Sequence, residues 1–299
     1  MKLKMLLTVM MCVIMPLSLS FGKDKEQSDK CLDRLHKALR KYENQRYHDT
    51  RAILDEAKYQ CSGHPAMDSI LYYLGMSLLQ TKSYMEARVE FERLVQDHPR
   101  SAFAEEAHFR VGLAAYKQSN PPQKDQAQTH VAIRALSGFI HQRPESEYAD
   151  SAQKYVDMAY EKLAEKEYHN ARFYEQIEKY ESAVVYLRDL IERYPESKYI
   201  PQAQLALAQD LIRISRPSEA KEVLETLLAG DPPKQIKRKA RQLLKEDDGE
   251  KHPPQKQQKE EASPVAKENN NSLKDFSPPV IDESTESTMM DSPEDADTE

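Results

Sequence analysis

Two stretches of the chain, residues 83–99 and 179–195, share one spacing of small and hydrophobic residues. The shared positions are Tyr84, Ala87, Phe91, Leu94 and Pro99 in the first stretch, and Tyr180, Ala183, Leu187, Leu190 and Pro195 in the second. The alanine, the large apolar residue and the leucine lie four and three residues apart, so they share one face of an α-helix. Because proline cannot continue a helix, we interpret each stretch as a helix that ends before its proline.

The segment before the first of these helices supplies a second apolar face. Leu71, Leu74 and Leu78 recur at helical spacing, and Gly75 lies among them. A glycine has no Cβ atom, so we expect another helix to cross close to this position. The two segments together match the tetratricopeptide repeat, a helix–turn–helix unit of 34 residues, over residues 68–101.

The same pattern occurs five times along the chain. The other copies are marked by Leu35, Leu39, Tyr42, Tyr47, Leu54 and Ala57; by Val111, Gly112, Ala132, Leu136, Phe139 and Pro144; by Tyr174 before the second quoted stretch; and by Leu207, Ala208, Leu211, Ala220, Leu224, Leu227 and Pro232. The predicted fold class is therefore all-α, a tetratricopeptide-repeat α-solenoid of about five helical hairpins. Each hairpin buries its apolar face only against the next one.

Some segments depart from the strict repeat. The first hairpin is degenerate and is expected to turn near residues 43–46, and the third contains an eight-residue insertion around SNPPQKDQ. Residues 146–163 are expected to form an additional helix between the third and fourth repeats. The stretch Lys234–Lys245 is predicted to cap the stack, with Leu243 and Leu244 packed inward.

The two ends of the chain differ from the repeats. Residues 1–22 begin with lysines, continue with the apolar run MLLTVMMCVIMPL and end in small residues, which is typical of a secretory signal peptide. Residues 247–299 are acidic and rich in proline and serine without an apolar period, so we expect a disordered tail. The predicted repeat domain is residues 23–246.

Export changes the interpretation of the three cysteines. Cys12 would leave with the signal peptide, and the large residues before it are not typical of a lipoprotein signal. Cys31 and Cys61 remain in an oxidising compartment and are predicted to form one disulfide, since the first hairpin brings residue 31 opposite about residue 60. Two separate buried thiols are the alternative.

Composition and motifs exclude several classes of function. The chain has 299 residues, a formal net charge of -7 and only 7 glycines. A mildly basic body with an acidic tail is not typical of a nucleic-acid-binding protein. The sequence shows no phosphate loop, no zinc-binding histidine spacing and no catalytic constellation, so we expect no enzyme, no metal and no cofactor. A hydrolase carrying a repeat domain would need a catalytic domain, which the tail cannot supply.

The first helix of each repeat indicates where a ligand would bind. In a tetratricopeptide hairpin, five positions of this helix face the concave groove. In the amino-terminal half these positions include Tyr72, Met76, Leu79, Phe109, Leu113 and Tyr116, whereas the carboxy-terminal half is mixed and charged. An exposed stripe of this kind favours an apolar or extended peptide as the ligand. The alternative is that the stripe belongs to the core and is covered by the amino-terminal hairpin.

Within residues 102–200 the chain resembles one family, BamD, the tetratricopeptide member of the outer-membrane β-barrel assembly machinery. The resemblance rests on the insertion with Asp125 and Gln126, on the run AIRALSGFIHQRPESEY, and on the run EKLAEKEYHNARFYEQIEKYESAVVYLRDLIERYP. It implies a periplasmic, non-enzymatic subunit that is peripheral at the inner face of the outer membrane. Amino-terminal repeats of that family are taken to recognise unfolded outer-membrane proteins, and carboxy-terminal repeats dock on the barrel-forming subunit.

For partner docking, the resemblance and the basic character of the carboxy-terminal half point to Arg172, Arg188 and Arg213. Arg188 is the nearest match to a basic contact residue of the family. Because no lipid-modified cysteine is apparent, we expect a protein partner to hold the chain at the membrane. The main alternative is an adaptor of the Tol-Pal system or of another envelope or cell-wall complex, which carries similar repeats after a coiled coil.

Overall fold

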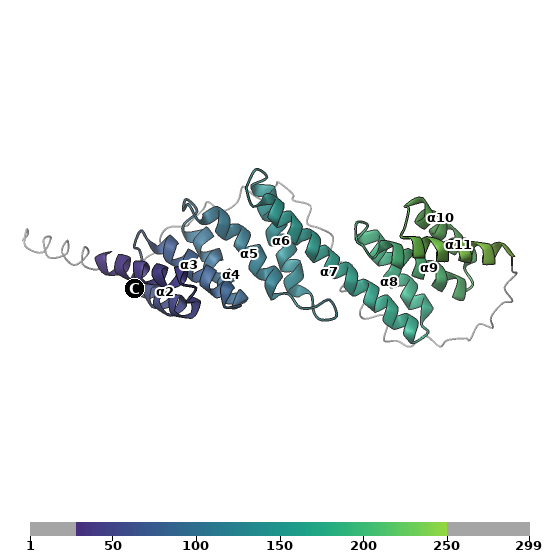
Figure 1. The fold of residues 1–299 in the computed structure, drawn as a ribbon, viewed down its shortest axis with the longest axis horizontal. Coiled ribbons are helices and arrows are strands. Elements are labelled where there is room, and N and C mark those ends of the chain that lie inside the picture. Colours follow the sequence, from purple (N-terminus) through teal and green to yellow (C-terminus); the bar gives the residue numbers. More distant parts are fainter. Residues whose placement is uncertain (1–27, 250–299) are drawn as a thin grey trace, which may run out of the picture. The chain divides into compact units, whose positions relative to one another are not determined.

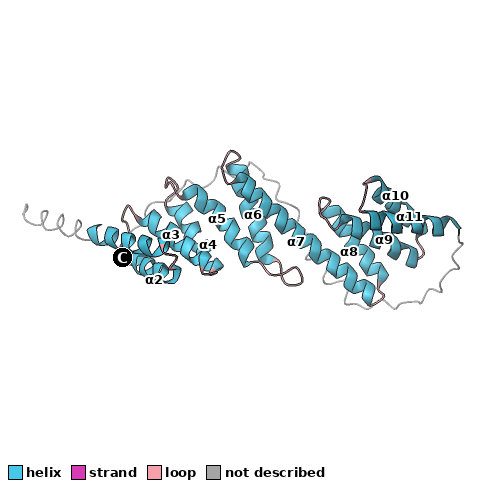
Figure 2. Ribbon diagram, viewed as in Figure 1, coloured by secondary structure: helices cyan, strands magenta, loops and turns pink. Residues whose placement is uncertain are grey.

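The computed structural model describes residues 28–249, and every regular element in that range is a helix (Figures 1 and 2). A first helix covers residues 28–43 of the described range. The others are α2 (Tyr47–Gln60), α3 (Met67–Gln80), α4 (Tyr84–Asp97), α5 (Ala104–Gln118), α6 (Ala127–Gln142), α7 (Ala149–Gln176), α8 (Tyr180–Arg193), α9 (Ile200–Arg213), α10 (Pro217–Ala229) and α11 (Lys234–Gly249). The predicted signal peptide and the tail beyond residue 249 lie outside the described residues.

Consecutive helices from α2 to α11 pack against one another, as tetratricopeptide hairpins do. Two glycines permit close crossings within hairpins. A Cβ atom built on Gly75 in α3 would lie 2.7 Å from a ring carbon of Phe91 in α4, and one on Gly112 in α5 would lie 2.5 Å from Cγ of Leu136 in α6. The close crossing predicted at Gly75 is confirmed, and the fold class is the predicted one.

The α7 helix corrects one prediction. The additional helix expected over residues 146–163 and the first helix of the fourth repeat form one continuous helix of 28 residues, Ala149–Gln176. Its sequence contains neither glycine nor proline and is rich in alanine, glutamate and lysine, so nothing ends the helix between the two segments. The single helix packs against α5 and α6 before it and against α8 after it.

Four of the hairpin turns share one backbone geometry. Each places a residue with positive φ after the first helix: Gln45, Lys82, Glu178 and Ser215, at φ of 57°, 62°, 59° and 61°. The residue after it donates its N–H to the carbonyl five positions earlier, as Ser83 does to Leu78 at 2.9 Å. This is a Schellman-type helix end, in which glycine is the usual residue. The sequence does not reveal these turns because none of the four residues is glycine.

The third hairpin has the predicted insertion in place of that turn. Gln126 is 4% exposed and organises the loop: its Nε2 atom donates to the carbonyls of Pro121 at 2.7 Å and Lys124 at 3.1 Å, and its Oε1 atom accepts from Thr129 at 2.6 Å. Asp125 accepts a hydrogen bond from the N–H of Ala127 at the start of α6, at 3.0 Å. The two residues that carried part of the family resemblance thus hold the insertion together.

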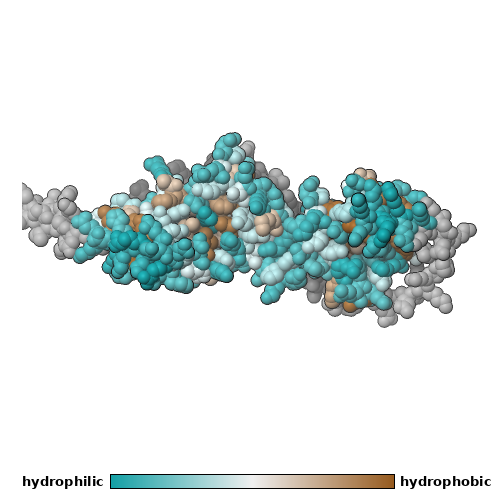
Figure 3. Space-filling view, viewed as in Figure 1, coloured by the Kyte–Doolittle hydropathy of each residue, from teal (hydrophilic) through white to brown (hydrophobic). Residues whose placement is uncertain are grey.

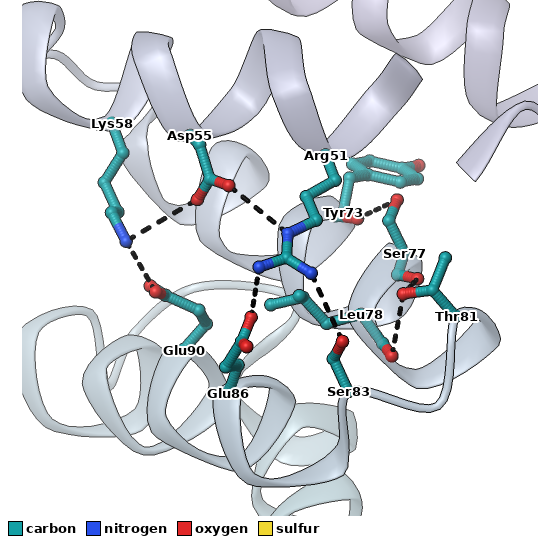
Figure 4. Close-up of polar contacts among 10 residues, drawn as sticks. All are labelled: Arg51, Asp55, Lys58, Tyr73, Ser77, Leu78, Thr81, Ser83, Glu86 and Glu90. Atoms are coloured by element: carbon teal, nitrogen blue, oxygen red, sulfur yellow. Dashed lines mark hydrogen bonds and ion pairs between the residues drawn. The ribbon is translucent and has the colours of Figure 1, made fainter. Parts of the chain in front are cut away.

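The first two hairpins are joined by buried apolar side chains and by polar contacts between α2 and α4 (Figure 4). Lys58 and Glu90 form an ion pair at 2.5 Å, with only 12% and 10% of their side chains exposed. Arg51 bridges to Glu86 and donates to the hydroxyl of Ser83 at 3.2 Å. Removing Lys58 would leave the mostly buried carboxylate of Glu90 without its ion-pair partner.

The sulfur atoms of Cys31 and Cys61 lie at bonding distance, with the Cα atoms 5.7 Å apart. That Cα separation falls within the range that a disulfide requires. Both residues are almost fully buried, and Cys31 lies on the first described helix while Cys61 follows α2. The hairpin turn between the two helices covers residues 44–46, close to the predicted position. Oxidation of the pair in the protein stays a prediction.

The carboxy-terminal helix α11 lies where the cap was predicted, but it ends later in the chain than expected. The α11 helix packs against α9 and α10, with Ala240 fully buried and Leu243 and Leu244 partly buried against the same core. It extends to Gly249, beyond the predicted boundary at residue 246. On the face drawn in Figure 3, hydrophilic residues cover most of the surface and hydrophobic residues appear in separate patches.

Candidate functional site

An aromatic pair recurs at three junctions between repeats. A residue in the first helix of a repeat stacks on an aromatic residue in the turn that follows the same repeat. The pairs are Tyr72 with Phe103, Phe109 with Tyr148, and Tyr168 with Tyr199, with ring centroids 4.3, 5.5 and 5.2 Å apart. In each turn, the N–H of the second aromatic residue donates to a serine hydroxyl two residues earlier. The turn after each proline therefore places a ring over the preceding helix.

These pairs correct the prediction of an exposed aromatic stripe. Tyr72 is 9% exposed, Phe109 4% and Leu113 4%, so all three belong to the core. The alternative interpretation, that the stripe is core, holds for these three residues. The cover, however, does not come from the amino-terminal hairpin alone, because Phe103 and Tyr148 supply rings from the later turns. The sequence signal was available: after the second helix of each of these three repeats, the chain reads Pro-x-Ser-x-aromatic.

Hydrogen bonds fix Tyr72 further. Its hydroxyl donates to Oε2 of Glu106 at 2.7 Å, and Arg110 donates to Oε1 of the same carboxylate at 2.6 Å. Burial first, and then the hydrogen bond to Glu106, raise the pKa of Tyr72 well above its usual value. Tyr72 is thus a neutral, positioned core residue.

The other three residues of the predicted stripe remain partly exposed. Met76 and Leu79 on α3 are half-buried and pack against the core of the first two hairpins, and Tyr116 on α5 is half-buried. The ring of Tyr116 contacts that of Tyr155 on α7, with centroids 5.2 Å apart. These three side chains are the part of the stripe that a ligand can reach.

Tyr116 also borders a cleft of about 1010 Å³ across the middle of α7. The lining includes Tyr116, Pro122, Met158, Tyr160, Lys162 and Tyr194, together with four carboxylate side chains. Met158 and Tyr160 are 42% and 45% exposed, which is high for apolar side chains. The ammonium of Lys162 lies 4.6 Å from the centroid of the Tyr116 ring and donates to Ser119 at 2.5 Å. Burial lowers the pKa of Lys162. Sequence reasoning missed this cleft because its residues come from three segments.

The three arginines predicted for partner docking are each about half exposed and each already paired with a carboxylate of this chain. Arg172 pairs with Glu175 on α7, and Arg188 on α8 with Glu219 on α10. Arg213 on α9 donates to Oδ1 of Asp210 at 2.7 Å and lies over the ring of Tyr180, 4.9 Å from its centroid.

The structure brings two of these arginines together around one buried acid. Asp210 has no exposed surface, and both Arg172 and Arg213 act on its charge. Burial first, and then the nearby Glu175, raise the pKa of Asp210 to about 6. Arg188 belongs to a separate group with Glu219 and Arg216.

The described residues show no other chemistry that would define a site. Residues 28–249 contain no group of three or more histidine, cysteine, aspartate or glutamate side chains placed to hold a metal ion. None of the helices within this range is both long and apolar enough to cross a membrane. The stacked helical hairpins define the class of protein: a tetratricopeptide-repeat protein.

The family follows from comparison with known proteins. A family model described as outer membrane lipoprotein (YfiO) matches residues 32–227. The chain belongs to this family, the BamD family. The outer membrane protein assembly factor BamD of Caulobacter vibrioides is 27% identical over 155 residues, which are 52% of this chain and 49% of that protein. A putative assembly factor BamD of Aquifex aeolicus is 26% identical over 209 residues, 69% of this chain and 62% of that protein.

The chain thus spans about half of the length of the first relative and less than two thirds of the second. Among solved structures, MamA from Desulfovibrio magneticus overlaps with a TM-score of 0.33 at 16% identity, over 67% of this chain and 94% of that one. The tetratricopeptide domain of P58(IPK) overlaps with a TM-score of 0.39 at 11% identity, over 73% and 56%. Neither overlay adds to the family assignment.

Proposed function

We propose that this protein is a non-enzymatic scaffold subunit of the outer-membrane β-barrel assembly machinery. It binds segments of unfolded outer-membrane proteins through its amino-terminal half and docks on the barrel-forming subunit through its carboxy-terminal half. The observation that carries this proposal is the family match over residues 32–227, together with relatives that are named for outer membrane protein assembly. The location that goes with it is the periplasm, peripheral at the outer membrane.

For the client segment, we propose a site formed by Met76, Leu79 and Tyr116 and continued by the cleft across α7. The buried residues Tyr72, Phe109 and Leu113 support this surface from beneath. An extended segment with alternating apolar side chains can place them against such half-exposed aromatic and methionine side chains. In this cleft the client would meet the side chains of Met158, Tyr160 and Tyr194, beside the ammonium of Lys162, two further basic side chains and the four carboxylates.

The client site is tested with a peptide taken from the last strand of an outer-membrane protein. Tyr116→Ala is expected to weaken binding of this peptide by about 1–3 kcal/mol, as truncation of an anchor side chain does. Tyr59→Ala is the matched control, because Tyr59 is 78% exposed on α2, away from the cleft. Equal peptide affinity for both variants, measured by fluorescence anisotropy, would show that Tyr116 takes no part.

For the partner, we propose that the carboxy-terminal half holds the protein at the membrane through Arg172, Arg188 and Arg213. Arginine suits this role because its planar guanidinium binds a carboxylate through two hydrogen bonds. Arg188→Glu should release the protein from membranes into the soluble periplasm, whereas Arg100→Glu makes the same charge change at an exposed site in the amino-terminal half and should not. Truncation after Lys245 should leave membrane association intact or stronger.

Two outcomes would redirect the proposal. If Arg188→Glu stays with the membrane at low and high salt alike, docking through charge is wrong and a lipid anchor is the better account. If the chain co-purifies with Tol-Pal components and never with the barrel-forming subunit, the adaptor of another envelope complex becomes the function. Both outcomes can be read from fractionation and cross-linking in cells.

A further inference from the structure

The two docking arginines around Asp210 cannot bind a partner without changing their own ion pairs. Arg172 is held by Glu175 and Arg213 by Asp210, each three residues away on the same helix. A carboxylate of a partner that binds these guanidinium groups must therefore share them with the carboxylates of this chain, or replace those carboxylates. The strength of docking then depends on how firmly the internal carboxylates hold the arginines.

Asp210 differs from an ordinary surface partner of an arginine. It is fully buried, its Oδ1 atom accepts from Arg213, and its Oδ2 atom is buried with no hydrogen-bond partner in the described part of the chain. Glu175 likewise has a buried carboxylate oxygen, Oε1, without a hydrogen-bond partner among the described residues. Two buried carboxylate oxygens without donors make the ionised form of this site costly, and a proton removes that cost.

Three charged side chains act on Asp210, two arginines and one glutamate. Arg172 and Glu175 approach from α7 and Arg213 from its own helix, and Tyr180 at the start of α8 lies under Arg213. The α10 and α11 helices pack on this core with apolar side chains, among them Val223 and Leu243. When Asp210 takes up a proton, the set of two arginines and two acids changes from neutral to a single net positive charge.

We propose that Arg172, Glu175, Asp210 and Arg213 form one docking site for a carboxylate of the partner, and that proton uptake by Asp210 strengthens this docking. This inference deepens the proposed function and rests on it for the identity of the partner. In acidic medium Asp210 is neutral, Arg213 loses its internal counter-ion, and the guanidinium becomes available. In neutral or basic medium the ionised Asp210 competes with the carboxylate of the partner. Asp210 is therefore a residue that tunes affinity from beneath the surface.

The pKa values support this geometry. The pKa of Asp210 is raised to about 6, first by burial and then by Glu175, so Asp210 gains its proton as the pH falls through about 6. Glu219, the partner of Arg188, behaves in the opposite way. Desolvation, the largest single contribution, acts to raise the pKa of Glu219. The hydrogen bonds and positive charges of Arg188 and Arg216 together outweigh it and hold this pKa below its usual value, so Glu219 stays ionised throughout.

The test measures binding of the full chain to an oligo-glutamate peptide, and in a second arm to the barrel-forming subunit, at pH 5.5 and pH 7.5. The wild type is expected to bind either ligand roughly tenfold more tightly at pH 5.5 than at pH 7.5. The reason is that protonation of Asp210 gives this partly exposed site one unit of net positive charge, which attracts the carboxylates of the ligand. Asp210→Asn should show the tighter affinity at both pH values. Glu219→Gln is the matched control, since it removes a carboxylate that does not titrate in this range and should leave the pH dependence unchanged.

The inference is overturned if Asp210→Asn keeps the pH dependence of the wild type. Should Asp210→Asn fail to fold, the carboxyl carbon of Asp210 in the wild type can be followed by NMR: a midpoint near 6 is expected, and a midpoint near 4 contradicts the inference. Failure of the proposed function gives a different result. In that case the barrel-forming subunit does not bind at any pH, while the oligo-glutamate arm still reports on Asp210.

Discussion

Gly75→Ala tests whether the close crossing of α3 and α4 sets the geometry of the repeat. The new Cβ atom would lie 2.7 Å from Cε1 and 2.8 Å from Cζ of Phe91, and the ring is fully buried, so it cannot move aside without displacing the core. Overpacking of this kind costs about 1–3 kcal/mol. Alanine in place of glycine within a helix stabilises by about 0.5–1 kcal/mol. We therefore expect Gly75→Ala to lower the free energy of unfolding by up to about 2.5 kcal/mol.

Gly138→Ala is the matched control for this prediction. Gly138 lies inside α6, and a Cβ atom there would meet nothing within 4 Å, so the substitution gains helix propensity without a clash. Both variants gain the same helix propensity. The difference between their free energies of unfolding, about 1–3 kcal/mol, therefore equals the overpacking cost at Gly75. Urea unfolding followed by circular dichroism at 222 nm measures it. If Gly75→Ala is as stable as Gly138→Ala, the argument from close packing is wrong.

Three further results are expected. Phe109→Ala should destabilise the fold by about 3–5 kcal/mol in urea unfolding, because Phe109 is a core residue; a loss of peptide binding with unchanged stability would contradict its burial. Mass spectrometry of unreduced protein should show Cys31 linked to Cys61, and reduction of this disulfide should lower the free energy of unfolding by about 3–4 kcal/mol. Two free thiols in periplasmic material would contradict the disulfide. Asp210 has a pKa raised in the folded chain, so the stability it gives is complete below about pH 4 and is lost as the pH rises through about 6. Asp210→Asn should remove roughly 3 kcal/mol of that pH dependence, and an unchanged dependence would refute the assignment.

Much of the fold can be predicted from periodicity because each hairpin repeats the same local rules. Alanine and glycine mark the crossings, leucine and phenylalanine mark the faces, and proline marks the ends of the second helices. The length of α7 could not be read from the repeat spacing, since the pattern gives the faces of helices but not whether a helix stops between two faces. The absence of glycine and proline from residues 149–176 was the better signal.

The candidate surfaces were harder to predict because exposure depends on what covers a helix. The repeat position of Phe109 places it on the first helix of its hairpin, but only the turn that brings Tyr148 over the ring decides that it is buried. The pairing of Arg213 with Asp210 follows from their spacing of three residues on one helix. The full burial of Asp210 does not, because it depends on the packing of neighbouring helices.

Cross-linking in cells tests the central claim most directly. A photo-reactive amino acid is placed at Val185, which is 64% exposed on α8 and lies three residues before Arg188, and in a separate variant at Tyr59 on α2. The account predicts that the Val185 variant captures the barrel-forming subunit of the outer-membrane assembly machinery, and that the Tyr59 variant does not. Capture of that subunit from neither position, or from Tyr59 alone, would contradict docking through the carboxy-terminal half.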